Sequence, residues 1–173
     1  CSSDLTLLSN FKDKHRVIGI TPEEIGRIAI NRGIPTIIDY FSERSVAQTL
    51  SEHGKARIIT ATNVFAHIEN INNIVLLIMS LMEHDGIFIT ESHYLLPLIE
   101  NLQYDTIYHE HLRYYSLTSI KYLLESHGLQ VVHAKRIPTH GGSIRVYAAR
   151  KGVYSISFTV DALLSAELPV VIN

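Results

Sequence analysis

The sequence has little of several residue types, and each shortage excludes a class of protein. It contains a single cysteine, so no disulfide forms within the chain. It has no excess of positive charge, because 15 Lys and Arg stand against 17 Asp and Glu. The formal charge of −2 excludes a strongly basic nucleic-acid-binding protein. The longest apolar run, residues 74–82, is much shorter than the roughly 18 residues of a membrane-spanning helix.

The composition is that of a compact globular domain. Apolar residues make up 46% of the chain and charged residues 18%, which is enough for one hydrophobic core. No basic stretch followed by an apolar stretch marks a signal peptide, so the cytoplasm is the predicted location. The chain starts with the polar Cys1-Ser2-Ser3-Asp4 and without Met, and we expect it to be a piece of a longer protein whose first strand is missing.

Short apolar segments alternate with helical patterns over the first 90 residues. Strands are predicted at 16–20, 34–38, 57–62 and 86–90, and helices at 4–14, 22–32, 43–53 and 71–82. Apolar strands between helices are typical of a parallel sheet with helices on both faces.

The rhythm changes after residue 91. Helices are predicted at 94–102, 118–127 and around 160–164, and strands at 129–137 and 143–150. A five-residue loop with two glycines joins these two strands, as in an antiparallel hairpin. The predicted fold class is therefore α/β, with a mostly parallel, doubly wound sheet that ends in an antiparallel hairpin. Ligands of such folds bind at the carboxyl ends of the strands.

A polar segment at residues 104–115 is the strongest candidate for a site. It holds Tyr108, His109, Glu110 and His111, and a histidine beside a carboxylate and phenols can exchange protons near neutral pH. The same residues are also compatible with a buried polar network or an exposed surface. His109 and His111 have the spacing of two metal ligands, but no further ligand set is spaced to join them, so we predict no metal.

Two other loops offer polar groups. In the hairpin loop the glycines either supply a positive φ or let the backbone approach a ligand. His140, Ser143 and Arg145 place donors there that suit phosphate or sugar oxygens. Asn63 and His67 lie in the loop after the strand at 57–62, which is expected to face the ligand crevice. Like most of the other histidines, His67 taken alone is more typical of a surface or structural group.

These segments resemble a known family, the S-adenosylmethionine-dependent sugar C-methyltransferases, which act on nucleotide-linked 4-keto deoxysugars. The resemblance rests on Asn63-Val64-Phe65-Ala66-His67-Ile68, on Tyr104-Asp105-Thr106-Ile107-Tyr108-His109-Glu110-His111, and on His140-Gly141-Gly142-Ser143-Ile144-Arg145-Val146-Tyr147. It implies a Rossmann-like class I methyltransferase domain over 1–150, with 151–173 as the start of a C-terminal segment. It also implies S-adenosylmethionine as cofactor and a nucleotide-sugar as small-molecule substrate.

The resemblance assigns roles to individual residues. It implies that the catalytic residues are His111 as base, Glu110 and Tyr108. The cofactor-binding residues that it implies are Ser3, Asp4, Thr21, Asp39 and Asn63. The substrate-binding residues that it implies are His140, Ser143 and Arg145.

Two departures from the family pattern affect the cofactor site. The family's Gly-Ser-Asn-Asp-Gly-like loop is Cys1-Ser2-Ser3-Asp4-Leu5 here, and Thr21 stands where an acidic residue pairs with the ribose hydroxyls. An inactive methyltransferase-like binding domain is therefore an alternative. A metal-dependent enzyme using His109 and His111 is a further one. An NAD-binding oxidoreductase would also need a glycine-rich loop and a ribose acid.

Replacing Thr21 tests the second departure. Thr21→Glu should tighten S-adenosylmethionine binding by about 1.5 to 3 kcal/mol, roughly ten- to a hundredfold, because a carboxylate makes a charge-assisted contact to two hydroxyls. Titration calorimetry measures this change. Equal or weaker affinity would mean that the ribose is held in another way.

Overall fold

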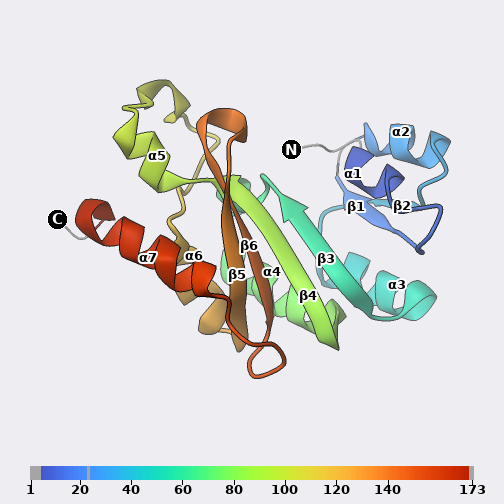
Figure 1. Cartoon of the computed structure of the whole chain (residues 1–173). Helices are drawn as coiled ribbons and strands as arrows, with labels where there is room; N and C mark the ends of the chain where they lie inside the picture. The colour runs from blue at the N-terminus through green and yellow to red at the C-terminus, as the bar shows by residue number, and fades with distance from the viewer. Residues whose placement is uncertain (1–4, 23, 172–173) are drawn as a thin grey trace. The chain divides into compact units, whose positions relative to one another are not determined.

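The computed structural model describes residues 5–22 and 24–171. The chain divides into two compact units, Cys1–Lys55 and Ala56–Asn173 (Figure 1). The predicted domain over 1–150 and the C-terminal segment over 151–173 remain predictions. Within the described residues, no helix is both long and apolar enough to cross a membrane.

The first unit alternates helices with two short strands. Its elements are α1 (Thr6–Ser9), β1 (Gly19–Thr21), α2 (Gly26–Asn31), β2 (Thr36–Ile38) and α3 (Glu43–His53). The two strands pair in parallel, with Gly19 opposite Thr36 and Thr21 opposite Ile38. The predicted order of elements and the parallel pairing are therefore confirmed in this unit.

The bounds of the helices were predicted correctly where side-chain caps define the helix ends, and wrongly where such caps are lacking. The predicted bounds of α3 are confirmed, because Ser42 forms a capping box with Ser45 and Gly54 ends the helix at φ 77°. The predicted lengths of α1 and α2 are wrong. Neither helix has a side-chain cap, and α1 starts after Leu5 in a left-handed conformation and ends in turns.

The second unit holds a four-stranded mixed sheet. Its elements are β3 (Ala56–Thr62), η1 (Phe65–His67), α4 (Ile71–Leu81), β4 (Met82–His93), α5 (Leu95–Glu100), η2 (Tyr104–Thr106), α6 (Leu117–Glu125), β5 (Leu129–Ile137), η3 (Thr139–Gly141), β6 (Ser143–Arg150) and α7 (Phe158–Val171). The strand order is β3-β4-β6-β5, with β3 parallel to β4 and both other pairs antiparallel. The predicted hairpin is confirmed with the predicted bounds of both strands.

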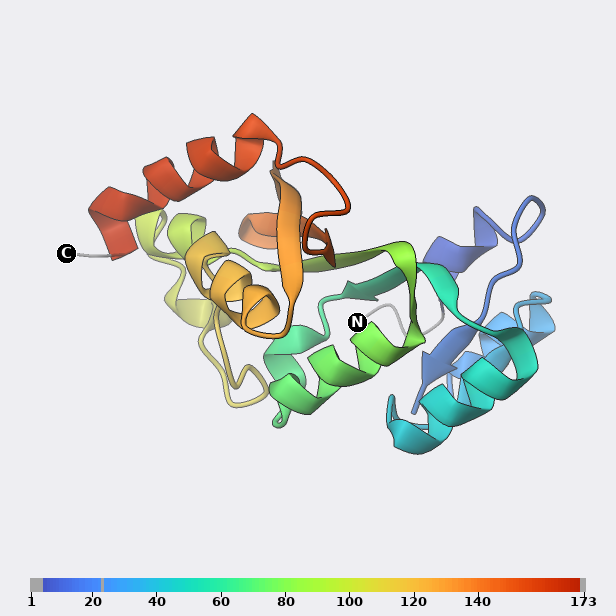
Figure 2. The same cartoon turned by 90° about the horizontal axis from the view of Figure 1, so that it is seen from below.

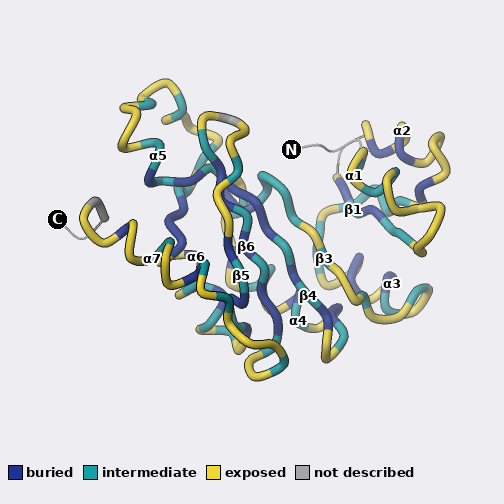
Figure 3. Tube along the Cα trace, in the orientation of Figure 1, coloured by how far each residue is buried: buried dark blue, intermediate teal, exposed yellow. Residues whose placement is uncertain are grey.

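The core of this unit lies on one face of the sheet. Figure 2 shows α4 and α6 on that face and α7 on the other. Side chains that point toward α4 and α6, such as Phe88 and Val146, are fully buried, and Figure 3 shows β4 and β6 as largely buried strands. At the sheet edge, Ile58 on β3 remains 64% exposed.

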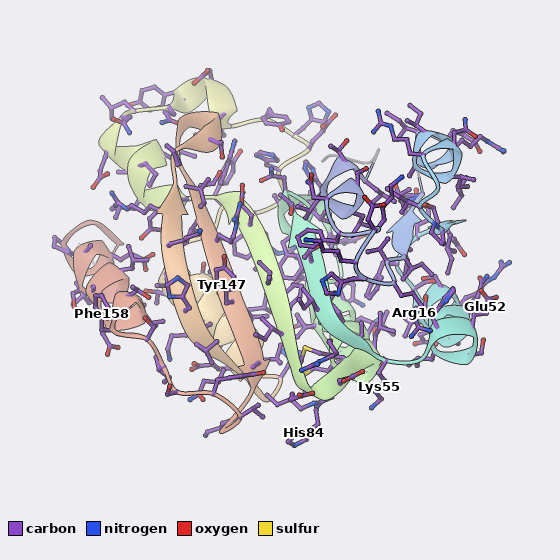
Figure 4. All side chains as sticks on the ribbon, turned by 45° about the vertical axis from the view of Figure 1, so that its right-hand side comes forward. Arg16, Glu52, Lys55, His84, Tyr147 and Phe158 are labelled. Carbon is purple, nitrogen blue, oxygen red and sulfur yellow. The ribbon has the colours of Figure 1, made fainter. Side chains whose placement is uncertain are left out.

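The opposite face carries polar side chains beneath α7. Tyr147 on β6 lies with its ring centroid 5.2 Å from that of His133 (Figure 4). His133 Nδ1 is 2.9 Å from the hydroxyl of Thr159 at the start of α7, whereas Phe158 beside it is 82% exposed. The first turn of α7 is therefore joined to the sheet through polar contacts.

A buried carboxylate joins α7 to α6. Glu167 is 1% exposed and accepts hydrogen bonds from the backbone N–H groups of Leu117 and Thr118, the latter at 2.9 Å. The Thr118 hydroxyl donates a third bond at 2.6 Å. These N–H groups open α6 and have no partner within the helix, so the carboxylate satisfies them and interacts favourably with the helix dipole.

Removing this carboxylate should destabilise the protein. We expect Glu167→Ala to lower the free energy of unfolding by about 2 to 4 kcal/mol, because it leaves buried N–H groups without acceptors. Glu125→Ala is the matched control at the other end of α6. Glu125 pairs with Lys121 at 2.6 Å and both are partly exposed, so its loss should cost only about 0.5 kcal/mol. Urea unfolding measures both, and equal losses would contradict the capping role.

Candidate active site

Three segments of the second unit meet beyond the carboxyl ends of β3 and β4. His67 comes from η1 after β3, His93 is the last residue of β4, and His111 comes from the segment between η2 and α6. The ring centroid of His111 lies 5.0 Å from that of His67 and 5.3 Å from that of His93. Three imidazoles, far apart in sequence, thus form one cluster.

Two tyrosines complete the surroundings of His111. The Tyr108 hydroxyl lies 2.9 Å from Nε2 of His111, and the two rings are 4.3 Å apart. The Tyr114 ring meets the imidazole edge-on at 5.5 Å. The other ring nitrogen, Nδ1, is buried and has no hydrogen-bond partner among the described residues. Nε2 is therefore the ring nitrogen that contacts Tyr108, which is 43% exposed.

Hydrogen bonds to backbone carbonyls hold the His111 segment against η1 and the residues that follow it. The N–H of Leu112 donates to the carbonyl of Ala66 at 2.9 Å. The Arg113 guanidinium donates to the carbonyls of Ile68 and Glu69, the latter at 2.8 Å. These contacts tie the residues directly after His111 to the backbone on either side of His67.

The environment of His111 favours its neutral form. Burial lowers the pKa of His111 below its ordinary value of 6.5, and the neighbouring His67 and His93 lower it further. The Glu110 charge acts in the opposite direction but is outweighed. An imidazole with a lowered pKa is unprotonated at neutral pH and can accept a proton.

The structure gives Glu110 and His109 less central places than His111. Both are exposed, and the contact that Glu110 makes to the cluster is through its backbone carbonyl, 2.9 Å from Nδ1 of His67. Among residues 5–22 and 24–171, no three His, Cys, Asp or Glu side chains are grouped to hold a metal. The absence of metal at His109 and His111 stays a prediction.

The hairpin loop packs against α5. Gly141 and Gly142 have φ of 75° and 119°. A Cβ on Gly142 would lie 2.6 Å from Pro97, and one on Gly141 would lie 2.5 Å from Gln103. Close packing within the protein therefore explains both glycines, without a ligand. Of the donors predicted here, the side chain of His140 lies outside the described residues.

Ser143 and Arg145 have partners within the protein. Ser143 is fully buried, and its hydroxyl donates to the carbonyl of Thr139 at 3.3 Å. Arg145 forms an ion pair with Glu91, which lies opposite it on β4, with Nε and a terminal nitrogen 2.8 and 2.6 Å from one carboxylate oxygen. The predicted role of both residues in substrate binding remains a prediction.

The described members of the predicted cofactor set lie at strand ends. Thr21 ends β1 with 5% exposure, and the N–H of Asp39, just after β2, donates to its carbonyl at 3.0 Å. The Asp39 carboxylate accepts a bond from the Tyr40 N–H at 2.8 Å. Asn63 follows β3 with φ 53°, and its N–H donates to the carbonyl of Glu91 at 2.8 Å. Ser3 and Asp4 lie outside the described residues.

Sequence reasoning missed part of the cluster. The sequence assigns no role to His93, does not single out Tyr114 within the candidate segment 104–115, and favours a surface or structural group for His67 taken alone. Glu91, now seen as the partner of Arg145, was also missed. One signal was available in the sequence. His67 comes shortly after β3 and His93 ends β4, and the carboxyl ends of two parallel neighbouring strands share one sheet edge.

The fold and the cluster define a class: a Rossmann-like α/β domain with proton-accepting side chains beyond the carboxyl ends of its parallel strands. The chain belongs to the methyltransferase domain family, whose model matches residues 6–134. This confirms the predicted fold class.

Individual proteins support the same assignment. Over 135 residues the chain is 41% identical to the C-methyltransferase NovU of Streptomyces niveus, covering 78% of this chain and 32% of that protein. The chain thus spans about a third of the length of this curated relative. A SAM-dependent methyltransferase from Anabaena variabilis superposes with a TM-score of 0.64 at 16% identity, over 86% of this chain and 74% of that one. An S-adenosylmethionine-dependent methyltransferase from Clostridium acetobutylicum gives 0.66 at 13% identity, over 87% and 81%.

Removing one neighbouring imidazole should change the titration of His111. His93→Asn is expected to raise the pKa of His111, because the positive charge that His93 can carry disfavours a second one nearby. His84→Asn, at the exposed opposite end of β4, is the control and should leave the pKa unchanged. NMR titration of the histidine rings measures both. An unchanged or lower pKa in His93→Asn would contradict the cluster.

Proposed function

We propose that this chain is the catalytic domain of an S-adenosylmethionine-dependent C-methyltransferase that methylates a carbon next to a ketone. The observation that carries the proposal is the His111 imidazole, which is hydrogen-bonded through Nε2 to Tyr108 and has a lowered pKa. A family match over residues 6–134 supports it. The similarity to a C-methyltransferase supports carbon as the atom that receives the methyl group.

Methylation next to a ketone requires a base. Loss of the proton on this carbon leaves an enolate, whose charge is shared with the carbonyl oxygen. Nε2 of His111 has one lone pair, which faces the Tyr108 hydroxyl, so in the proposed reaction the phenol oxygen takes that proton while its own hydrogen passes to Nε2, and His111 becomes an imidazolium. The electron pair of the broken C–H bond would then form the bond to the incoming methyl group, while the methyl–sulfur bond would break and leave its electron pair on the sulfur as a neutral thioether. The 2.9 Å contact between the Tyr108 hydroxyl and Nε2 keeps the phenol and the imidazole aligned for this transfer.

The first unit offers groups that suit the nucleoside part of the cofactor. Thr21 and Asp39 lie at the same edge of the β1–β2 pair. A hydroxyl and a carboxylate there would suit sugar hydroxyls or an adenine amine. These two residues would hold the nucleoside. The bound cofactor would supply a methyl group made electrophilic by the sulfonium.

The substrate that we propose is a nucleotide-linked 4-keto deoxysugar, as the resemblance in residues 104–111 and 140–147 implies. The residues that we assign to substrate binding are His140, Ser143 and Arg145. Arg145 would act there as part of its ion pair with Glu91. Because this chain spans 32% of its curated relative, the activity is proposed for the longer protein that contains it. The cytoplasm is its proposed location.

An inactive binding domain is the second candidate. Thr21 favours this candidate, because its buried side chain offers no carboxylate to a ribose. Its methyl group packs closely against Gly26, where an added Cβ would lie 2.7 Å from it. Methyl transfer by the purified protein separates the two candidates.

Replacing the proposed base tests the function. His111→Asn should lower turnover by about 100-fold or more while S-adenosylmethionine affinity stays within about threefold, as expected for a positioned general base. His109→Asn, an exposed neighbour, is the control and should keep most of the activity. Transfer of labelled methyl and calorimetry provide the two measurements. Unchanged turnover in His111→Asn would refute the assignment.

A further inference from the structure

We propose that Tyr114 is a positioning residue that holds Tyr108 against His111. This inference rests on the proposed function, because it concerns the phenol and the imidazole assigned to proton transfer. Neither the family resemblance stated above nor the sequence pattern assigned a role to Tyr114.

The Tyr114 hydroxyl joins two backbone groups of the segment before His111. It donates to the carbonyl of Thr106 at 2.8 Å and accepts from the N–H of Tyr108 at 3.3 Å. A tyrosine hydroxyl has one hydrogen and acceptor capacity, so one oxygen can serve both groups. The backbone from 106 to 108 is thus tied to a residue that lies beyond His111 in the sequence.

Tyr108 needs such a restraint. Its side chain is 43% exposed, and an exposed tyrosine samples several rotamers unless its backbone and its hydroxyl are both held. The contact at Nε2 of His111, 2.9 Å long, fixes the hydroxyl end, and Tyr114 fixes the backbone end. The ring of Tyr114 also contacts His111 edge-on, with centroids 5.5 Å apart.

The hydroxyl can be removed without removing the ring. Tyr114→Phe keeps the ring contact with His111 and loses both hydrogen bonds. Tyr104→Phe is the matched control, since Tyr104 lies in the same segment, is 70% exposed, and makes no hydrogen bond through its hydroxyl in the described part of the chain. The full-length protein is compared as wild type, Tyr104→Phe, Tyr108→Phe, Tyr114→Phe and the Tyr108→Phe/Tyr114→Phe double variant.

Kinetics show whether Tyr114 acts through Tyr108. We expect Tyr114→Phe to lower kcat by about tenfold with KM for S-adenosylmethionine unchanged, since a displaced catalytic group slows the chemical step. In the Tyr108→Phe background the same change should have no further effect, because residues that act through one another are not additive. Independent, multiplied losses in the double variant, or an unchanged kcat in Tyr114→Phe, would overturn the proposal.

A readout that does not need methyl transfer separates this inference from the proposed function. The ¹⁵N shift of His111 Nε2 should change in Tyr114→Phe in the same direction as in Tyr108→Phe, and should match wild type in Tyr104→Phe. A wild-type shift in Tyr114→Phe would overturn the positioning role. A protein without methyltransferase activity that still shows the coupled shifts would refute the function and leave the positioning role intact.

Discussion

The site depends on one backbone contact, which joins the two ends of the segment between β4 and α6. The N–H of Leu95 donates to the carbonyl of Tyr115 at 2.9 Å, and Tyr94 and Tyr115 form a parallel bridge. This contact returns the chain to the end of β4 after twenty residues. It brings His111 next to His93, the last residue of β4, and leads directly into the capped start of α6.

Clustering these imidazoles has an electrostatic consequence. A second positive charge within about 5 Å is unfavourable, and burial adds to this cost. The cluster therefore keeps His111 neutral, which lowers its intrinsic strength as a base but keeps it unprotonated where the protein is expected to work. Positioning by Tyr108 and exclusion of water from Nδ1 then matter more than high basicity.

The sequence predicted local structure well where local signals are strong. Capping at Ser42 and Gly54 gave α3, and alternating β-formers around two glycines gave the hairpin. Local signals were insufficient where residues distant in sequence determine the length or the capping of an element. β4 reaches from Met82 to His93 because β6 pairs with its second half, and Glu167 binds the start of α6 from fifty residues away. In the site, His111 and Tyr108 were found in one motif, whereas His93 is brought in by the sheet.

Proton abstraction by His111 is the central claim, and exchange of the substrate's carbon-bound hydrogen tests it most directly. The full-length protein is incubated in D₂O with a nucleotide-linked 4-keto deoxysugar and S-adenosylhomocysteine, which cannot donate a methyl group, and deuterium at the carbon next to the ketone is followed by NMR. The account predicts exchange in the wild type that is lost in His111→Asn and kept in His109→Asn. Exchange that persists in His111→Asn at the wild-type rate would contradict it.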